Sequence, residues 1–219
     1  MVFKKATRWF CWEVMSGFDS SDDEENEELD LSPFIVNWLD MSCVGCAEQL
    51  GISGLPGCRF KDTWRSLETD IVTLKGMEIT EVFVLCTKGE LNKYRVPYLL
   101  HEYTGADFNV HHHPFPDGQA PSVAGMVKML EELKVNLMQG RKTLLHCFGG
   151  LGRSCVVAAC LLMYMDESLD SESAIQRLRQ LRGPGAVQSV KQYNFIHDFR
   201  KNLEEYEQGK EEASRSVSR

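Results

Sequence analysis

Residues 144–155 have the sequence LLHCFGGLGRSC. An apolar strand at 143–147 ends in His146 and Cys147, and an apolar helix begins near Arg153. The five residues between them include three glycines, so the backbone can turn tightly and direct its N–H groups inward. The first turn of the helix adds the positive end of its dipole. This order of strand, loop and helix predicts a site that binds an anion.

The cysteine at the rim of this loop is a candidate nucleophile. Converging amides and the helix dipole favour the thiolate of Cys147, which is the reactive form. Arg153 can fold its planar guanidinium over the loop and bind two phosphate oxygens. Ser154 can hydrogen-bond the sulfur and make it a better leaving group, and His146 can orient Cys147 or help hold its charge. A buried cysteine before an ordinary turn would explain neither the glycines nor Arg153.

These residue types favour attack on a phosphate ester through a cysteinyl-phosphate. The phosphate would be held by Arg153 and by the loop residues Phe148, Gly149, Gly150, Leu151 and Gly152. The departing oxygen needs an acid. Asp117 lies in a Pro/Gly-rich loop thirty residues before Cys147, where a general acid and a turn-forming Asp-Gly pair are both open interpretations. Asp107 is the alternative acid, but it begins a predicted strand and is less free to move.

The apolar pattern predicts alternating strands and helices, which indicates an α/β fold. The expected strands span 34–38, 82–86, 107–111 and 143–147. Helices are expected at 61–74, 121–140, 153–165, 171–181 (with Ser171 as its cap) and 189–206, while 43–59 and 87–90 read as loops and turns. We therefore predict a single domain with a central, largely parallel, twisted sheet of about five strands and helices on both faces.

The charge distribution separates a tail from the domain. The chain has 219 residues and a net charge of −8, and eight of its 32 acidic residues lie between Asp19 and Asp30, leaving 24 acids against 24 bases elsewhere. We expect a disordered acidic segment at 1–32, a phosphatase domain at 33–208 and a flexible tail at 209–219. The balanced remainder excludes a general nucleic-acid surface. Ser20 and Ser21 precede acids, so this segment is either a phosphorylation site or a solvated tail.

The apolar runs, the cysteine spacing and the histidine run bear on the compartment of the protein and on its cofactors. No apolar run reaches the ~20 residues of a membrane span, and no secretory signal is evident, so we expect no membrane association and a reducing compartment, the cytoplasm and nucleus. Cys43 and Cys46 form one Cys-x-x-Cys without the second pair of a zinc ribbon, so we expect free thiols. Adjacent histidines at 111–113 point to opposite faces of a strand, and no carboxylate-rich pattern joins them. We therefore expect neither a metal nor another cofactor.

The segment around Cys147 resembles the His-Cys-x5-Arg-Ser/Thr signature of the cysteine-based protein phosphatases. The resemblance extends over about residues 33–219 to the kinase-associated phosphatase family of the dual-specificity enzymes. It is carried by KYRVPYLL (93–100), HHHPFPDG (111–118), RKTLLHCFGGLGRSC (141–155), LRGPGAVQSVKQYNF (181–195) and RSVSR (215–219). The resemblance implies that Asp117 is the general acid, and that Gln188, with Gln192 one helical turn later, positions the water of the second step. Surface polarity is the other reading of both glutamines.

The resemblance also implies a substrate. We expect a monomeric protein phosphatase acting on phosphothreonine or phosphoserine as well as phosphotyrosine, with a phosphorylated cyclin-dependent kinase as its partner. The target would be the activation-loop phosphothreonine of that kinase, so that the enzyme restrains the cell cycle, and helix 189–206 would help grip the kinase. Two alternatives remain: a kinase-binding inhibitor whose activity is incidental, and an inositol-lipid phosphatase. Inositol-lipid phosphatases favour basic residues inside the loop that follows the cysteine, and residues 148–152 contain none.

Overall fold

The sheet at the centre of the molecule has five strands in the order β1-β2-β7-β5-β6. The computed structural model describes residues 29–42, 45 and 50–217. The strands are β1 (Asn37–Leu39), β2 (Leu50–Ser53), β5 (Glu81–Val84), β6 (Asn109–His112) and β7 (Thr143–His146). All neighbours are parallel except β1, which is antiparallel to β2. The carboxyl ends of four strands therefore meet at one edge of the sheet, and a separate hairpin is formed by β3 (Arg59–Phe60) and β4 (Thr63–Trp64).

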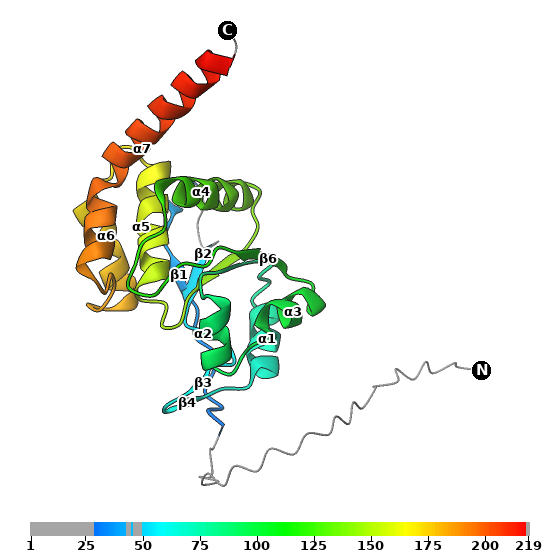
Figure 1. The fold of residues 1–219 in the computed structure, drawn as a ribbon. Coiled ribbons are helices and arrows are strands. Elements are labelled where there is room, and N and C mark those ends of the chain that lie inside the picture. Colours follow the sequence, from blue (N-terminus) through cyan, green and yellow to red (C-terminus); the bar gives the residue numbers. More distant parts are fainter. Residues whose placement is uncertain (1–28, 43–44, 46–49, 218–219) are drawn as a thin grey trace.

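Helices cover both faces of the sheet, as predicted (Figure 1). On one face lie α4 (Val123–Met138), α5 (Arg153–Met165) and α6 (Ser171–Arg182). The helices α1 (Leu67–Gly76) and α3 (Leu99–Gly105) lie on the other side, and the short α2 (Lys88–Lys93) follows β5. Strands β2, β5 and β7 are buried along their whole length because both faces are covered. The predicted α/β fold is confirmed.

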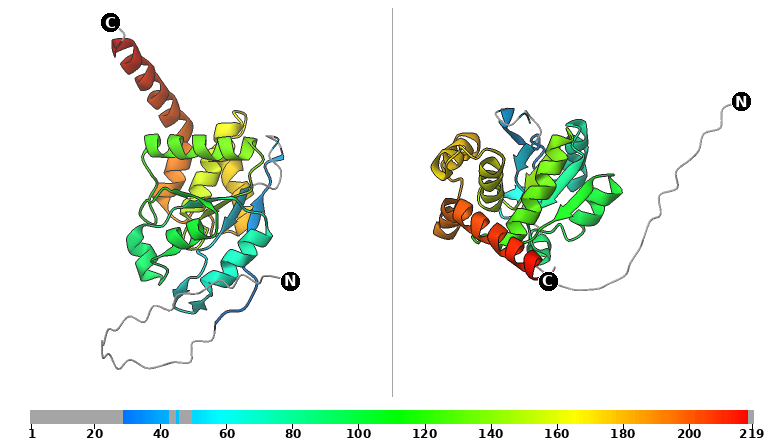
Figure 2. Two further views of the ribbon diagram at one scale, coloured as in Figure 1. Left: turned by 90° about the vertical axis from the view of Figure 1, so that its right-hand side faces the viewer. Right: turned by 90° about the horizontal axis from the view of Figure 1, so that it is seen from above.

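Helix α5 lies inside the helical layer. It contacts α4, α6, α7 and strand β7, and its residues from Arg153 to Met163 are all buried. The last helix, α7 (Val190–Val217), buries Ile196 and Phe199 against this layer. Its later turns project away from the domain (Figure 2), so the helix continues well beyond the end predicted near Tyr206. No helix among the described residues is both long and apolar enough to cross a lipid bilayer.

The prediction of a loop over 43–59 is wrong for residues 50–53, which form the internal strand β2. Leu50 and Ile52 are fully buried, and the glycine between them, Gly51, is a residue type that favours loops in the sequence. A Cβ at Gly51 would collide with the Val36 side chain, so glycine is needed for β1 and β2 to pack closely. The glycine therefore marks a close approach of two segments rather than a chain reversal.

Several predicted boundaries differ from those observed. The first strand begins at Asn37, and the helix expected from Lys61 begins at Leu67 because 63–64 pair with β3 and Ser66 caps the helix. The turn expected at 87–90 is the start of α2. The cap of α6 is Asp170, which accepts a hydrogen bond from the Ser173 amide, and not Ser171.

The ordered chain begins before Pro33. The Asp30 amide donates to Trp64 O at 2.7 Å, and Arg65 pairs with the Asp30 carboxylate at 2.9 Å. Arg65 also donates to Ser32 O and pairs with the buried Asp70. Residues 30–32, which the sequence analysis assigns to the disordered segment, thus contact the domain through the Asp30 amide and through Arg65. Residues 1–28, with Ser20 and Ser21, lie outside the described part of the chain.

Candidate active site

The loop between β7 and α5 is held from outside through its carbonyl groups. Phe148 O accepts from the Leu55 amide and Leu151 O from the Val187 amide, both at 2.9 Å. Arg182 donates to Gly149 O at 2.9 Å and, through Nε, to Gly150 O at 3.1 Å. Four consecutive carbonyls are therefore bound by other segments and turned away from the concave side of the loop.

The amides of this loop consequently face the other way. Within the described residues, no N–H group of 148–152 donates a hydrogen bond. Gly150 has φ +66°, and a Cβ there would collide with the Ser53 carbonyl group. A Cβ at Gly152 would lie 2.8 Å from Gln188 Oε1. The glycines are needed for this close-packed turn, which leaves the loop amides without a partner in the described chain, as an anion site would require.

The candidate nucleophile and the histidine before it are both buried. Cys147 directly follows β7, the central strand, at the rim of the loop. His146 Nε2 lies 3.1 Å from the Tyr103 hydroxyl. Burial lowers the pKa of His146 to about 3, although the Cys147 backbone opposes this, so His146 is neutral near pH 7. A neutral imidazole can orient Cys147, and it adds no positive charge beside the sulfur at that pH.

Arg153 is completely buried and is fixed by a residue that the sequence analysis missed. Glu90 Oε2 accepts from Nη1 at 2.8 Å, and Oε1 accepts from Nη2 at 2.7 Å. Nη1 also donates to Leu85 O and Phe115 O, whereas Nε and Ser154 Oγ make no hydrogen bond within the described chain. The plane of the guanidinium is thus set by Glu90 of α2, and its Nε edge faces Asp117. The capping box from Thr87 to Glu90 was the available signal.

Asp117 lies beside this arginine. Its Oδ1 is 3.4 Å from Arg153 Nε, and its side chain is 58% exposed. The loop that carries it is attached to the start of α7, because Ser189 Oγ donates to Gly118 O at 2.7 Å. Asp107 instead precedes β6, at the opposite edge of the sheet, where it pairs with Lys75. The structure brings Asp117, and not Asp107, to the nucleophile loop.

Both candidate glutamines also reach the loop. Gln192 is fully buried, and its Oε1 accepts from the Gln188 amide at 2.9 Å. Their side chains lie around Gly152, the last loop residue before α5. Gln192 Nε2 is 3.4 Å from Gln119 O, in the loop of Asp117. Gln192 is therefore not a surface residue. Its buried side-chain amide links the loop of Asp117 to the loop 148–152.

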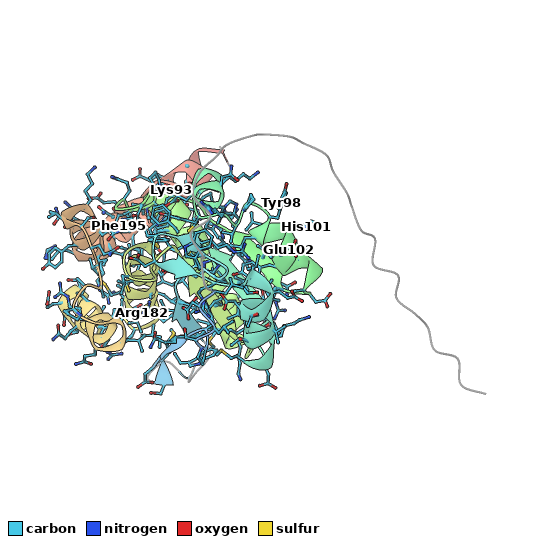
Figure 3. The ribbon with its side chains drawn as sticks, turned by 90° about the horizontal axis from the view of Figure 1, so that it is seen from below. Lys93, Tyr98, His101, Glu102, Arg182 and Phe195 are labelled. Carbon is cyan, nitrogen blue, oxygen red and sulfur yellow. The ribbon has the colours of Figure 1, made fainter. Side chains whose placement is uncertain are left out.

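Arg182 is a second residue that the sequence did not single out. Besides its two bonds to the loop, it hydrogen-bonds Asn37 of β1, and it lies between α6 and that edge of the sheet (Figure 3). In the sequence, Arg182 lies directly before Gly183, a position that indicates only the end of a helix. Arg182 therefore positions the loop backbone without facing its concave side.

The histidine run is arranged differently from the expectation. His112 points to one side of β6 and reaches Cys86 O, as alternation predicts. His111 and His113 share the other side and converge on Glu132 of α4. The expectation that no carboxylate joins them is wrong, because the carboxylate comes from a distant helix. Cys43 and Cys46 lie outside the described residues.

The chain is similar to known proteins along most of its length. The sequence profile of the family described as cyclin-dependent kinase inhibitor 3 matches residues 12–175. Relatives with that name are 50% identical in Sus scrofa and 49% in Homo sapiens, each over 204 residues that cover 93% of this chain and 96% of the relative.

Solved structures agree with this result. A kinase-associated phosphatase with its catalytic-site cysteine substituted by serine has 49% identity and a TM-score of 0.77, covering 80% of this chain and 98% of that one. The active form of Tk-PTP has 30% identity and a TM-score of 0.59, covering 70% and 92%.

Proposed function

This chain belongs to the cyclin-dependent kinase inhibitor 3 family of cysteine-dependent phosphatases, and from that membership we propose that it hydrolyses phosphothreonine, phosphoserine and phosphotyrosine in proteins. The single observation that carries the proposal is the loop after Cys147. Its carbonyls are bound outward, its amides are free to meet phosphate oxygens, and a fixed guanidinium lies beside it.

In the first step the Cys147 thiolate attacks phosphorus. Loop amides and Arg153 bind the non-bridging oxygens, where charge is spread in the transition state. Asp117, close to Arg153 Nε, donates its proton to the departing side-chain oxygen. The products are the free hydroxyl of the substrate and a cysteinyl-phosphate.

In the second step water attacks the cysteinyl-phosphate. Gln188 and Gln192 lie at the Gly152 end of the loop and orient this water through their amide groups. Asp117, now ionised, accepts the proton of the water, and Ser154 stabilises the departing thiolate of Cys147. Inorganic phosphate leaves, and Asp117 is again protonated.

We propose a cyclin-dependent kinase as the protein substrate, through the phosphothreonine of its activation loop. Support comes from relatives named cyclin-dependent kinase inhibitor 3, at 49–50% identity. The loop interior contains no Lys, Arg or His, which disfavours inositol lipids because several phosphates would need further positive charge.

The decisive experiment compares an intact kinase phosphorylated on its activation loop with the isolated phosphopeptide. A much higher kcat/KM for the intact kinase supports remote docking, and equal values remove that part of the proposal. Cys147→Ser should bind the kinase without releasing phosphate. If this variant inhibits the kinase as well as the wild type does, the adaptor reading replaces the enzyme reading.

A further inference from the structure

A second cluster of ionisable side chains lies on strand β6, away from the phosphate loop. His111 and His113 are two residues apart on the strand, so they share one face and meet helix α4. His111 Nδ1 lies 3.2 Å from Glu132 Oε2, and His113 Nε2 lies 2.8 Å from the same oxygen. All three donor atoms are within 4.8 Å of one another.

A buried carboxylate lies behind His111. Glu81 Oε2 is 2.9 Å from His111 Nε2, and Glu81 Oε1 accepts from Asn109 at 2.8 Å and from Arg141 at 3.1 Å. Glu81 Oε1 already accepts two hydrogen bonds, so this carboxylate faces His111 Nε2 as an acceptor. His111 therefore donates its Nε2 proton to Glu81.

The other nitrogen of His111 then faces a second acceptor. With its proton on Nε2, a neutral His111 presents the Nδ1 lone pair to the Glu132 carboxylate. Two acceptors at 3.2 Å repel each other unless a positive charge lies between them, either a proton or a metal ion. His113 directs a second imidazole nitrogen at the same oxygen, so two imidazole nitrogens converge on one carboxylate oxygen.

Two imidazole nitrogens and one carboxylate oxygen form a donor set that zinc and neighbouring first-row metals prefer. Tetrahedral ligands at ~2.0–2.2 Å from an ion lie about 3.4 Å apart, close to the separations here. Histidine ligands usually donate their other N–H to a carboxylate, as His111 does to Glu81. Phe83 stacks on both rings, at 6° to His111 and 11° to His113, and so keeps them nearly parallel.

We propose that His111, His113 and Glu132 bind a divalent first-row transition metal ion, with Zn²⁺ as the best match, and that Glu81 orients His111 for it. The three side chains are 16–31% exposed, so an ion reaches them from solvent and water completes its coordination. The ion would join α4 to the end of β6, the strand that leads into the loop of Asp117. This site is separate from the proposed phosphatase chemistry and holds even if that chemistry is wrong.

The test uses the full chain with Cys11, Cys43, Cys46 and Cys147 replaced by serine, since thiolates also bind zinc, and the other four cysteines are buried. Titration of the metal-free protein with Zn²⁺ in a calorimeter should show one ion per chain. His113→Ala and Glu132→Gln should each weaken binding at least about tenfold.

Matched controls come from α3. His101 and Glu102 are exposed neighbours whose charged groups lie 3.8 Å apart, and Figure 3 shows them on that helix. His101→Ala and Glu102→Gln change the same residue types without touching the cluster, so they should leave the zinc affinity unchanged. Equal loss in these controls, or no loss in His113→Ala and Glu132→Gln, would overturn the proposal.

Locating the zinc ion directly in a crystal gives a test that does not depend on the folding of any variant. Anomalous diffraction at the zinc absorption edge, from a crystal grown with Zn²⁺, should place a peak between His111, His113 and Glu132. Peaks only at other histidines or at crystal contacts would refute the site. Melting curves of each metal-free variant identify any that is unfolded, and the anomalous map then decides the matter alone.

Discussion

Glu90 of helix α2 binds both terminal nitrogens of Arg153, at 2.8 Å to Nη1 and 2.7 Å to Nη2. The arginine has no exposed surface, and Glu90 is 16% exposed. Two parallel bonds fix the plane of a guanidinium as a single bond cannot. Helix α2, which follows β5, therefore positions a residue at the start of α5, and the orientation of the guanidinium that we propose for phosphate binding depends on both helices.

Glu90→Gln should both destabilise the protein and slow the enzyme. The amide keeps the shape but removes the charge opposite a buried guanidinium, and breaking such a pair costs ~3–5 kcal/mol. Urea unfolding should show a lower midpoint, and kcat/KM for a phosphopeptide should fall. Glu102→Gln, on an exposed side chain, serves as the control. A stable variant with full activity would show that Arg153 is positioned by its backbone partners alone.

Asp117→Ala should reduce kcat by ~10²–10⁴-fold, the usual contribution of a general acid. The loss should be smaller for substrates with good leaving groups, such as aryl phosphates, because these need less protonation. Asp107→Ala is the matched control, since that residue lies at the opposite edge of the sheet. Steady-state phosphate release measures both, and the assignment fails if Asp107→Ala shows the larger effect.

Cys147→Ser should abolish turnover and keep the binding of a phosphate analogue. The amides and Arg153 that hold the anion are unaffected by the change of sulfur to oxygen. Phosphate release measures the loss of turnover, and calorimetry with tungstate measures the retained anion binding. Loss of tungstate binding in a folded variant would mean that the sulfur helps to hold the loop.

Alkylation should select Cys147 over the other described thiols. Burial raises the pKa of Cys58 to about 11 and that of Cys155 to about 12, and it also raises the pKa of Cys86 and Cys160. Cys147 alone among these five lies at the converging amides and a helix N-terminus. Brief treatment with iodoacetamide near pH 6, followed by mass spectrometry, should find the label there first. Equal labelling of the five would contradict the thiolate assignment.

His146 should make the fold less stable in mild acid. Its pKa is about 3 in the folded protein because of burial, and about 6.5 when unfolded. The unfolded state therefore binds the extra proton between these values, and stability is lost as the pH falls below about 6.5. From pH 7 to 5 the loss should be about 2 kcal/mol. Urea unfolding at both pH values should show that the free energy of unfolding falls less in His146→Asn than in the wild type. An equal fall in both proteins would mean that another group causes the acid sensitivity.

The parts of the fold that could be predicted were those with an undisturbed apolar period. Helix α4 carries a long apolar stripe and lies within the predicted range 121–140, and the uniformly apolar α5 has the predicted bounds 153–165. Strand β2 was missed because it has only four residues and contains a glycine whose need arises from a neighbouring segment. Contacts with residues distant in sequence determine such a strand, and no local pattern encodes them.

The same distinction applies to the candidate site. Cys147, Arg153 and the loop glycines are contiguous, so their chemistry could be inferred from spacing alone. Glu90 and Arg182 act on that loop from 63 and 32 residues away, through bonds that only the folded chain brings about. The contact of His111 and His113 with Glu132 also depends on the folded chain, because Glu132 lies on helix α4 and the histidines lie at the end of β6.

The parallel arrangement of four strands has a practical consequence. The proposed phosphatase chemistry lies at their carboxyl ends, so a probe attached at the amino ends is kept away from that reaction. Gln139 is exposed at the end of α4, just before β7 enters the sheet at that far edge. A fluorophore or surface tether introduced there would report on the molecule while leaving the phosphate loop unobstructed.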